Sequence, residues 1–219
     1  MNKLIELREI MIEHQKADQL IQGSWWNNAE QTGCFYGCAM HTDENPIKKA
    51  IRKFKIEPWV AYWSEKVFEG LPQKSALKWP VELLDAMIAF DGDYTDVYHK
   101  LSIKRLKRLY PTEDQKVNEA IKQVIDYHKA PSEKKRKAAN LAANSAVRSA
   151  HSASFSAAES AARSAADSAT SAATSTVFST ATSAAYSARS ADSAYSAAIE
   201  KHWEKERKWM LKLLGVSDE

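Results

Sequence analysis

The chain has 219 residues, a formal net charge of +3, and 27% charged and 44% hydrophobic residues, values that are ordinary for a globular protein of one or two domains. No apolar run reaches the roughly 18 residues that a membrane span requires, and the charged N-terminal segment lacks the apolar core of a signal peptide. These features exclude a predicted membrane or secreted protein and favour the cytoplasm. The net charge is too small to argue for nucleic-acid binding by itself.

Short helices are predicted for residues 1–130, which we expect to form a tryptophan-rich all-α domain. Apolar residues at three- and four-residue steps predict an amphipathic helix over 3–21 that Gly23 ends, with His14 near its buried side. A loop with two tryptophans follows. Prolines favour the first turn of a helix, glycines favour its end, and a capping box begins at Thr112. These signals predict further helices over 46–54, 58–70, from 80 until Gly92, from 93 or 95 to 109, and over 112–129.

Composition changes sharply after this domain. From Ser145 to Ala198 nearly every residue is Ala, Ser or Thr, and all tryptophans, glycines and prolines lie outside that window. One stripe of serines from Ser145 to Ser196 makes fourteen steps over 51 residues, about 3.6 residues per step, which is the period of an α-helix. We therefore predict an Ala/Ser-rich helical segment over 131–198, followed by an amphipathic C-terminal helix over 199–219 that docks on a core.

The small side chains of segment 131–198 predict close packing against other helices. A helical hairpin or a stack of shorter helices buries more alanine surface than a single long rod, so we expect the segment to fold back. The same surface suits a second copy of the chain, that is, a homo-oligomer. The alternatives are disorder and an ice-binding role, and the serines and charged residues of the stripes weaken the second.

The segment "TGCFYGCAMH", residues 32–41, holds both cysteines of the chain and a histidine. In a helix, Cys34, Cys38 and His41 occupy positions i, i+4 and i+7 on one face, where adjacent turns bring side chains about 5–6 Å apart. Two thiolates and an imidazole suit zinc, and His14 from the preceding helix is a candidate fourth ligand. The spacing matches no common zinc signature, in which ligands pair two to four residues apart in two separate knuckles.

Two other interpretations of this segment stay open. At a helix N-terminus Cys34 would have a lowered thiol pKa, so it is a candidate nucleophile with His14 or His41 as its base. No downstream His–Asn pair completes such a catalytic set. Alternatively, both thiols are buried in a packing motif, where Gly33 and Gly37 permit close backbone contact.

Two basic stretches, 48–55 and 99–110, combine positive charge with apolar residues at helical spacing. This pattern is typical of the solvated face of a surface helix, and it also suits a phosphate-binding face for nucleic acid. Few acidic residues lie nearby, which keeps the second interpretation open. The candidate contacts are Lys48, Lys49, Arg52, Lys53, Lys104, Arg105, Lys107 and Arg108.

Residues 14–87 resemble a set of phage and prophage proteins through the motifs HQKADQLIQGSWW, GCFYGCAMH, VFEGLP and WPVELLDA. Those proteins are similar in having a GC-x-x-GC-x-x-H core and an Ala-rich helical tail, and the tail is also loosely similar to that of a class of immunity proteins. The resemblance implies a phage context, and hence the host cytoplasm, but no mechanism. It favours a functional unit made of Gly33, Cys34, Gly37, Cys38 and His41.

The leading hypothesis is therefore a phage or mobile-element accessory protein that binds a host protein or a nucleic-acid-handling complex. The alternative from a different class is a small Cys/His-dependent enzyme, with or without zinc. No phosphate-binding glycine loop, paired-carboxylate motif or Ser–His–Asp arrangement is recognisable, so the sequence identifies no substrate.

Overall fold

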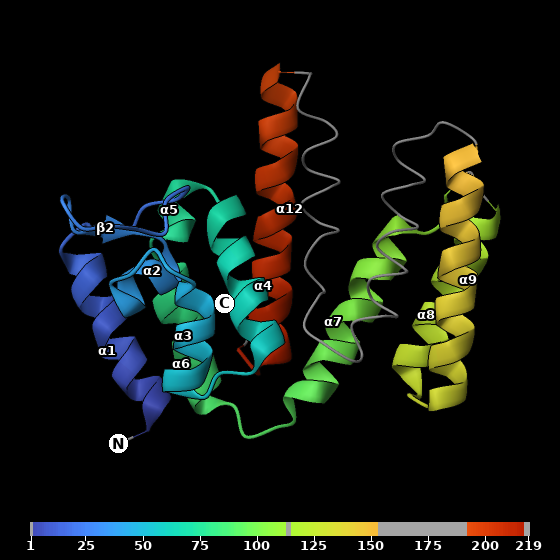
Figure 1. The fold of residues 1–219 in the computed structure, drawn as a ribbon, viewed down its shortest axis with the longest axis horizontal. Helices are drawn as coiled ribbons and strands as arrows, with labels where there is room; N and C mark the ends of the chain where they lie inside the picture. The colour runs from blue at the N-terminus through green and yellow to red at the C-terminus, as the bar shows by residue number, and fades with distance from the viewer. Residues whose placement is uncertain (1, 113–114, 153–191, 217–219) are drawn as a thin grey trace. The chain divides into compact units, whose positions relative to one another are not determined.

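The structure, a computed structural model, describes residues 2–112, 115–152 and 192–216, and gives the backbone alone for 145–152 and 192–197 (Figure 1). The described chain is predominantly all-α, which confirms the predicted fold class, and none of its helices is long and apolar enough to cross a membrane. It separates into two compact units, residues 1–93 with 196–219 and residues 94–195. The divisions predicted from composition, after 130 and after 198, stay predictions.

The first unit combines helices with one short antiparallel hairpin. Its strands are β1 (Trp26–Asn27) and β2 (Thr32–Gly33), in a region predicted as loop. Helices α3 and α4 have the predicted bounds, and each begins with a proline, whose fixed φ suits the first helical position. The helices of this unit are α1 (Lys3–Lys16), α2 (Phe35–Met40), α3 (Pro46–Phe54), α4 (Pro58–Gly70), α5 (Gln73–Ala76), α6 (Trp79–Ala89) and most of α12 (Asp192–Leu213).

Helix α1 ends at Lys16, so the predicted helix over 3–21 is wrong beyond that residue. Asp18 adopts a left-handed conformation with φ 54°. The chain then pairs with β2, where the backbone N–H of Gly33 donates to the carbonyl of Gln19 at 3.0 Å. Pairing with a strand further along the chain ends the helix, and the local apolar periodicity carries no sign of that pairing.

Aromatic residues fill the core of the first unit. Trp63 from α4 and Trp79 from α6 are 2% and 0% exposed, and their rings meet edge to face with centroids 5.7 Å apart. The indole N–H of Trp79 donates to the carbonyl of Ser64 at 2.9 Å, so this buried donor is satisfied. Other large side chains that are almost fully buried in this unit include Leu7, Met11, Phe35, Tyr36, Phe54, Phe68, Leu83 and Leu84.

Helix α12 docks on this core, which confirms the docking predicted for the C-terminal helix, and it lies beside α4 (Figure 1). Trp203 and Met210 are 5% and 0% exposed. Trp203 packs against Gly70, where an added Cβ would lie 2.0 Å from the indole nitrogen. The guanidinium of Arg207 donates to Glu82 Oε2 from both Nε (2.9 Å) and Nη2 (2.6 Å). The amphipathic pattern thus places its apolar side, together with the Arg207 ion pair, against α4 and α6.

The second unit contains α7 (Tyr94–Leu109), α8 (Gln115–Lys129) and α9 (Glu133–Ser152), of which α8 and α9 lie side by side (Figure 1). Ala139 and Ala143 of α9 are 0% exposed and share a core cluster with Val117 and Val124 of α8. Their small side chains let the two helices approach closely.

The serine stripe falls mainly outside the described residues. Its first turns continue α9 to Ser152, and its last residues lie in the first turns of α12 after Asp192. The predicted fold-back of the Ala/Ser-rich segment, and its predicted contact with a second copy of the chain, concern residues 153–191. Both therefore stay predictions.

Candidate functional site

Two glycines of the GCFYGC sequence bring the backbone of Trp25 onto α2. A Cβ at Gly37 would lie 1.3 Å from the Trp25 carbonyl oxygen, and a Cβ at Gly33 would lie 2.2 Å from the same atom. That oxygen accepts a hydrogen bond from the backbone N–H of Cys34 at 3.1 Å, at the start of α2. Both positions need glycine because the backbones approach so closely. This arrangement agrees with the packing interpretation of the motif.

Both thiols of the motif are buried and free, with Cys34 1% and Cys38 0% exposed. The sulfur of Cys38 contacts the carbonyl oxygens of Gly33 (3.2 Å) and Gln19 (3.5 Å). The sulfur of Cys34 contacts the carbonyl oxygen of Trp25 at 3.6 Å and also bonds to a carboxylate of α4. The two cysteines therefore have different partners, although they lie one helical turn apart.

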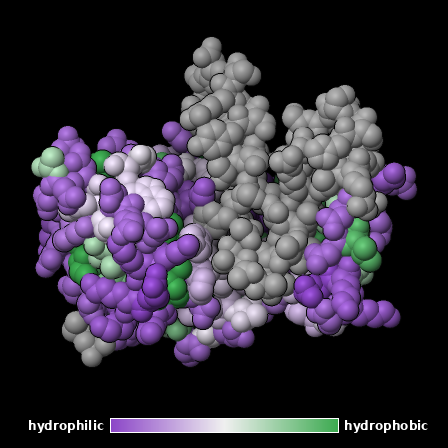
Figure 2. Space-filling view, in the orientation of Figure 1, coloured by the Kyte–Doolittle hydropathy of each residue, from purple (hydrophilic) through white to green (hydrophobic). Residues whose placement is uncertain are grey.

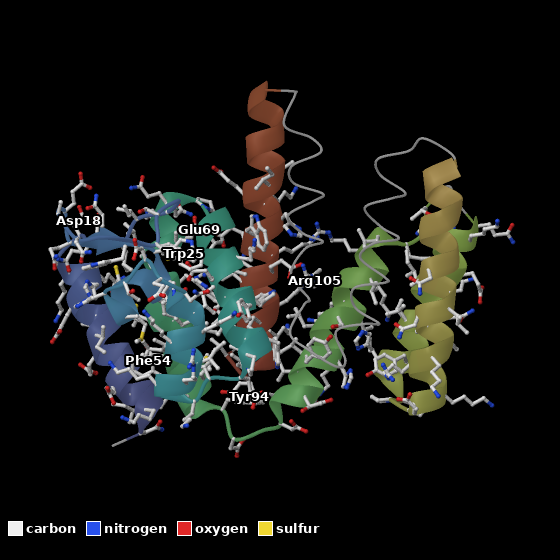
Figure 3. All side chains as sticks on the ribbon, viewed as in Figure 1. Asp18, Trp25, Phe54, Glu69, Tyr94 and Arg105 are labelled. Carbon is white, nitrogen blue, oxygen red and sulfur yellow. The ribbon has the colours of Figure 1, made fainter. Side chains whose placement is uncertain are left out.

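Cys34 meets two carboxylates of α4, those of Glu65 and Glu69. One ligand atom from each of the three residues lies within 4.8 Å of the other two, so this group could hold a metal ion. Within the described parts of the chain it is the one group of three or more His, Cys, Asp or Glu residues that meets this distance. Residues four apart on a helix share a face, which explains why both glutamates face Cys34. Glu69, labelled in Figure 3, also accepts from the N–H of Gly23 at 2.7 Å.

The Cys34 cluster, defined as Cys34, Glu65 and Glu69, concentrates acidic groups, and the positive charge of Lys66 offsets only part of the rise in the pKa of both glutamates. Glu65 is 8% exposed, and neither glutamate forms an ion pair within the described residues. Burial raises the pKa of Glu65 to about 7, and burial together with Glu65 raises the pKa of the Cys34 thiol far above its ordinary value. A bound cation would offset this cost by taking the place of the protons, because ligands must be deprotonated to bind it.

These charges bear on the hypothesis of a nucleophilic cysteine. A nucleophilic thiol needs a lowered pKa and a base within reach. Burial raises the pKa of Cys38 to about 12, and the pKa of Cys34 is raised as well. The acid–base group that bonds to Cys34 is the carboxyl of Glu65, and the two candidate bases, His14 and His41, pair with each other. The geometry therefore favours Cys34 as a ligand or packing group over a nucleophile.

His14 and His41 form a pair of their own. Their Nε2 atoms are 2.9 Å apart, and His14 Nδ1 lies 2.7 Å from Gln19 Oε1. The ring of Trp26 stacks on His41 with centroids 4.6 Å apart and planes inclined by 18°. His41 caps α2 in a left-handed conformation with φ 48°. Its ring contacts His14 and Trp26, whereas the two thiols have other partners.

The four predicted zinc ligands are thus found in three settings: Cys34 with two carboxylates, Cys38 with backbone carbonyls, and His14 with His41. A single site made of all four stays a prediction. The residues of these settings that the sequence did not predict are Gln19, Trp26, Glu65 and Glu69. Only the glutamates had a sequence signal, an acidic pair at i and i+4 within an otherwise apolar helix.

The first predicted basic stretch forms an exposed face on α3. Lys48 and Arg52 are exposed one helical turn apart, and Lys55 is exposed at the end of the helix. None of the three forms an ion pair within the described residues, whereas Lys49 and Lys53 each pair with a glutamate. No acidic residue occurs in α3, and Figure 2 shows hydrophilic residues over this part of the surface. We call Lys48, Arg52 and Lys55 the α3 cationic face.

The second predicted basic stretch lies on α7, in the other unit. Lys107 and Arg108 are exposed, and Lys104 and Arg105 are half-buried (Arg105 is labelled in Figure 3). Lys104, Arg105 and Arg108 interact with other groups of the chain. These interactions make α7 a weaker candidate than α3 for an anionic partner.

Comparison with known proteins gives the chain no family. No protein-family model, curated protein or solved structure matches it significantly. Its function therefore has to be inferred from the geometry and chemistry of these groups.

Proposed function

We propose that the protein is a phage or mobile-element accessory protein that acts by binding, and that its partner is the nucleic acid of a host nucleic-acid-handling complex. The α3 cationic face carries the proposal, because its three exposed cations form no ion pair with any acidic residue that the structure describes. The phage context rests on the resemblance of residues 14–87. The raised pKa values of both thiols support binding over covalent catalysis.

The spacing of the α3 cationic face suits a nucleic-acid backbone. Lys48 and Arg52 are separated by about 6 Å along the helix axis, at about 1.5 Å per residue. One strand of a duplex carries a phosphate about every 3.4 Å, so the pair spans about two phosphates. Arg52 can contact a phosphate through two N–H groups, and Lys48 contacts it as a point charge. Contacts of this kind give affinity that falls steeply with salt and depends little on base sequence.

The experiment is fluorescence anisotropy with a short labelled DNA duplex, measured over a range of salt concentrations. The test variant, Lys48→Gln with Arg52→Gln, removes two phosphate contacts, so the slope of log affinity against log salt should become shallower by about 2. The matched control is Lys74→Gln with Lys78→Gln, two exposed lysines of the same unit outside α3. Equal changes in slope for both variants would show that α3 has no special part in binding.

A second candidate function is favoured by the Cys34 cluster, for which we propose zinc as the ion. Thiolate sulfur and carboxylate oxygen are both zinc ligands. Three protein ligands leave a fourth coordination position open, as in catalytic zinc sites. Cys34, Glu65 and Glu69 would hold the ion, whose charge would balance the buried Glu65 carboxylate. Bound zinc supplies an activated water or polarises a carbonyl. On this proposal the protein is a small zinc-dependent enzyme.

Cobalt(II) tests the zinc proposal because it replaces zinc and gives a strong sulfur-to-metal absorption band when a thiolate binds it. The band should be lost in Cys34→Ser, weakened in Glu65→Gln, and kept in Cys38→Ser, the matched variant one helical turn away. Loss of the band in Cys38→Ser as well would instead support the predicted set with both cysteines. Absence of any band in the unmodified protein would remove the zinc proposal.

A further inference from the structure

The paired imidazoles of His14 and His41 are held by neighbouring side chains of the first unit. His14 is on α1 and is 7% exposed, and Gln19 Oε1 holds its Nδ1 atom at 2.7 Å. His41 ends α2 in a left-handed conformation, and Trp26, which is 6% exposed, stacks against its ring at 4.6 Å. His41 is an exposed residue. Gln19 and Trp26 therefore hold the two rings in place, and the pair can be approached from the exposed side of His41.

The hydrogen bond that Gln19 Oε1 accepts determines which nitrogen of His14 is available. An amide oxygen only accepts, so His14 Nδ1 carries the proton and its Nε2 presents a lone pair. That lone pair faces His41 Nε2 at 2.9 Å. When His41 also carries its proton on Nδ1, two lone pairs converge on one point. Metal-binding histidines have this arrangement, in which the second ring nitrogen donates to a protein oxygen that orients the ring.

The separation of the two Nε2 atoms fits a shared metal ion. Imidazole nitrogens bind zinc-sized ions at about 2.0–2.1 Å, so two of them at right or tetrahedral angles are about 2.9–3.4 Å apart. The observed 2.9 Å lies at the lower end of that range. Side-chain rotation of a few tenths of an ångström covers the rest of it.

We propose that His14 and His41 form a binding site for a divalent transition-metal ion that prefers imidazole ligands, such as Ni²⁺, Cu²⁺ or Zn²⁺. Water completes the coordination on the exposed side of His41, and Gln19 acts as the outer group that orients His14. The site goes beyond both proposed functions, because it uses neither the α3 cationic face nor any residue of the Cys34 cluster.

Lys53 acts electrostatically on His41 and would also repel a bound ion. Its ion pair with Glu6 at 3.8 Å offsets part of that charge.

The test uses Ni²⁺, which binds imidazole without oxidising the two thiols, and measures binding by isothermal titration calorimetry on the full chain. One ion per chain is expected at this pair, in addition to any ion that the Cys34 cluster holds. His41→Asn should lower the affinity more than tenfold and keep the fold, because asparagine tolerates the left-handed conformation of residue 41. Gln19→Leu should weaken binding about tenfold or more by freeing the His14 ring. Circular dichroism checks that each variant is folded.

The second histidine pair of the chain supplies the matched control. His99 Nδ1 and His128 Nδ1 are 2.8 Å apart in the other unit, and His128 is 2% exposed. His99→Asn should leave Ni²⁺ binding at the His14–His41 pair unchanged, as should Cys34→Ser, even where the latter removes an ion from the Cys34 cluster. The proposal would be overturned if either of these variants lost the site, if the site survived His41→Asn, or if no Ni²⁺ bound at all. The pair would then be a structural His–His hydrogen bond.

The fluorescence of Trp26 gives a second readout that a remote site would not affect. Ni²⁺ held by His41 lies next to the stacked Trp26 ring and should quench its emission. Trp26→Phe should keep an aromatic ring on His41, retain Ni²⁺ binding in the calorimeter, and remove most of the quenching. Quenching that is unchanged in Trp26→Phe would place the ion elsewhere and contradict the assignment.

Discussion

Gly37→Ala is expected to destabilise the first unit strongly, because the new methyl group meets the backbone rather than a flexible side chain. The Cβ would lie 1.3 Å from the Trp25 carbonyl oxygen, whereas ordinary contacts begin near 3.4 Å, so α2 and Trp25 must separate by about 2 Å. Overpacking alone costs about 1–3 kcal/mol. The separation also breaks the hydrogen bond from Cys34 to Trp25, worth about 1 kcal/mol. We expect a loss of about 3 kcal/mol or more.

Urea unfolding, followed by tryptophan fluorescence, measures this loss of unfolding free energy in the first unit. All seven tryptophans lie within residues 1–93 or 196–219, so the signal reports the first unit alone. The control is Gly23→Ala: Gly23 has φ 83° and no atom within 4 Å of an added Cβ. It should therefore lose only the conformational cost of about 1–2 kcal/mol. A Gly37→Ala protein as stable as Gly23→Ala would refute the contact between α2 and the Trp25 carbonyl.

Two further predictions concern charged groups of the same unit. A double-mutant cycle on Arg207→Gln and Glu82→Gln should give a coupling of about 1 kcal/mol, since the two-point ion pair is only partly exposed, and a value near zero would show that this ion pair does not stabilise the docking of α12. The pKa of Glu65 is raised from 4.5 to about 7 in the folded state, so metal-free protein should lose stability as pH rises from about 4.5 to 7, by at most about 3 kcal/mol. Glu65→Gln should flatten this decline in the urea midpoint, and an unchanged pH profile would contradict the burial of this carboxyl group.

Helix bounds could be predicted where one residue type acts locally. Pro46 and Pro58 begin α3 and α4 as predicted, because a fixed φ and a missing N–H are properties of the residue itself. The amphipathic stripe of α12 also predicted its docking, since burial follows the helical period. The end of α1 could not be predicted, because Gln19 leaves the helix to pair with Gly33.

The candidate sites were less predictable because they depend on contacts between distant segments. The sequence marks Cys34 and His41 as chemically interesting, but a continuous helix was assumed from one to the other. The left-handed conformation of His41 breaks that helix, and packing of α2 on α4 supplies Glu65 as the actual neighbour of Cys34. Neither event has a local signal. Gly33 and Gly37, in contrast, correctly predicted a close backbone contact, because glycine is the residue that such an approach requires.

The central claim is that the α3 cationic face binds a nucleic-acid backbone, and the salt dependence of binding by the unmodified protein tests it most directly. Two or three phosphate contacts from Lys48, Arg52 and Lys55 give a slope of about −2 to −3 when log affinity for a DNA duplex is plotted against log salt. A slope in this range, with little dependence on base sequence, is the expected result. No measurable binding at low salt, or a slope near zero, would contradict the claim.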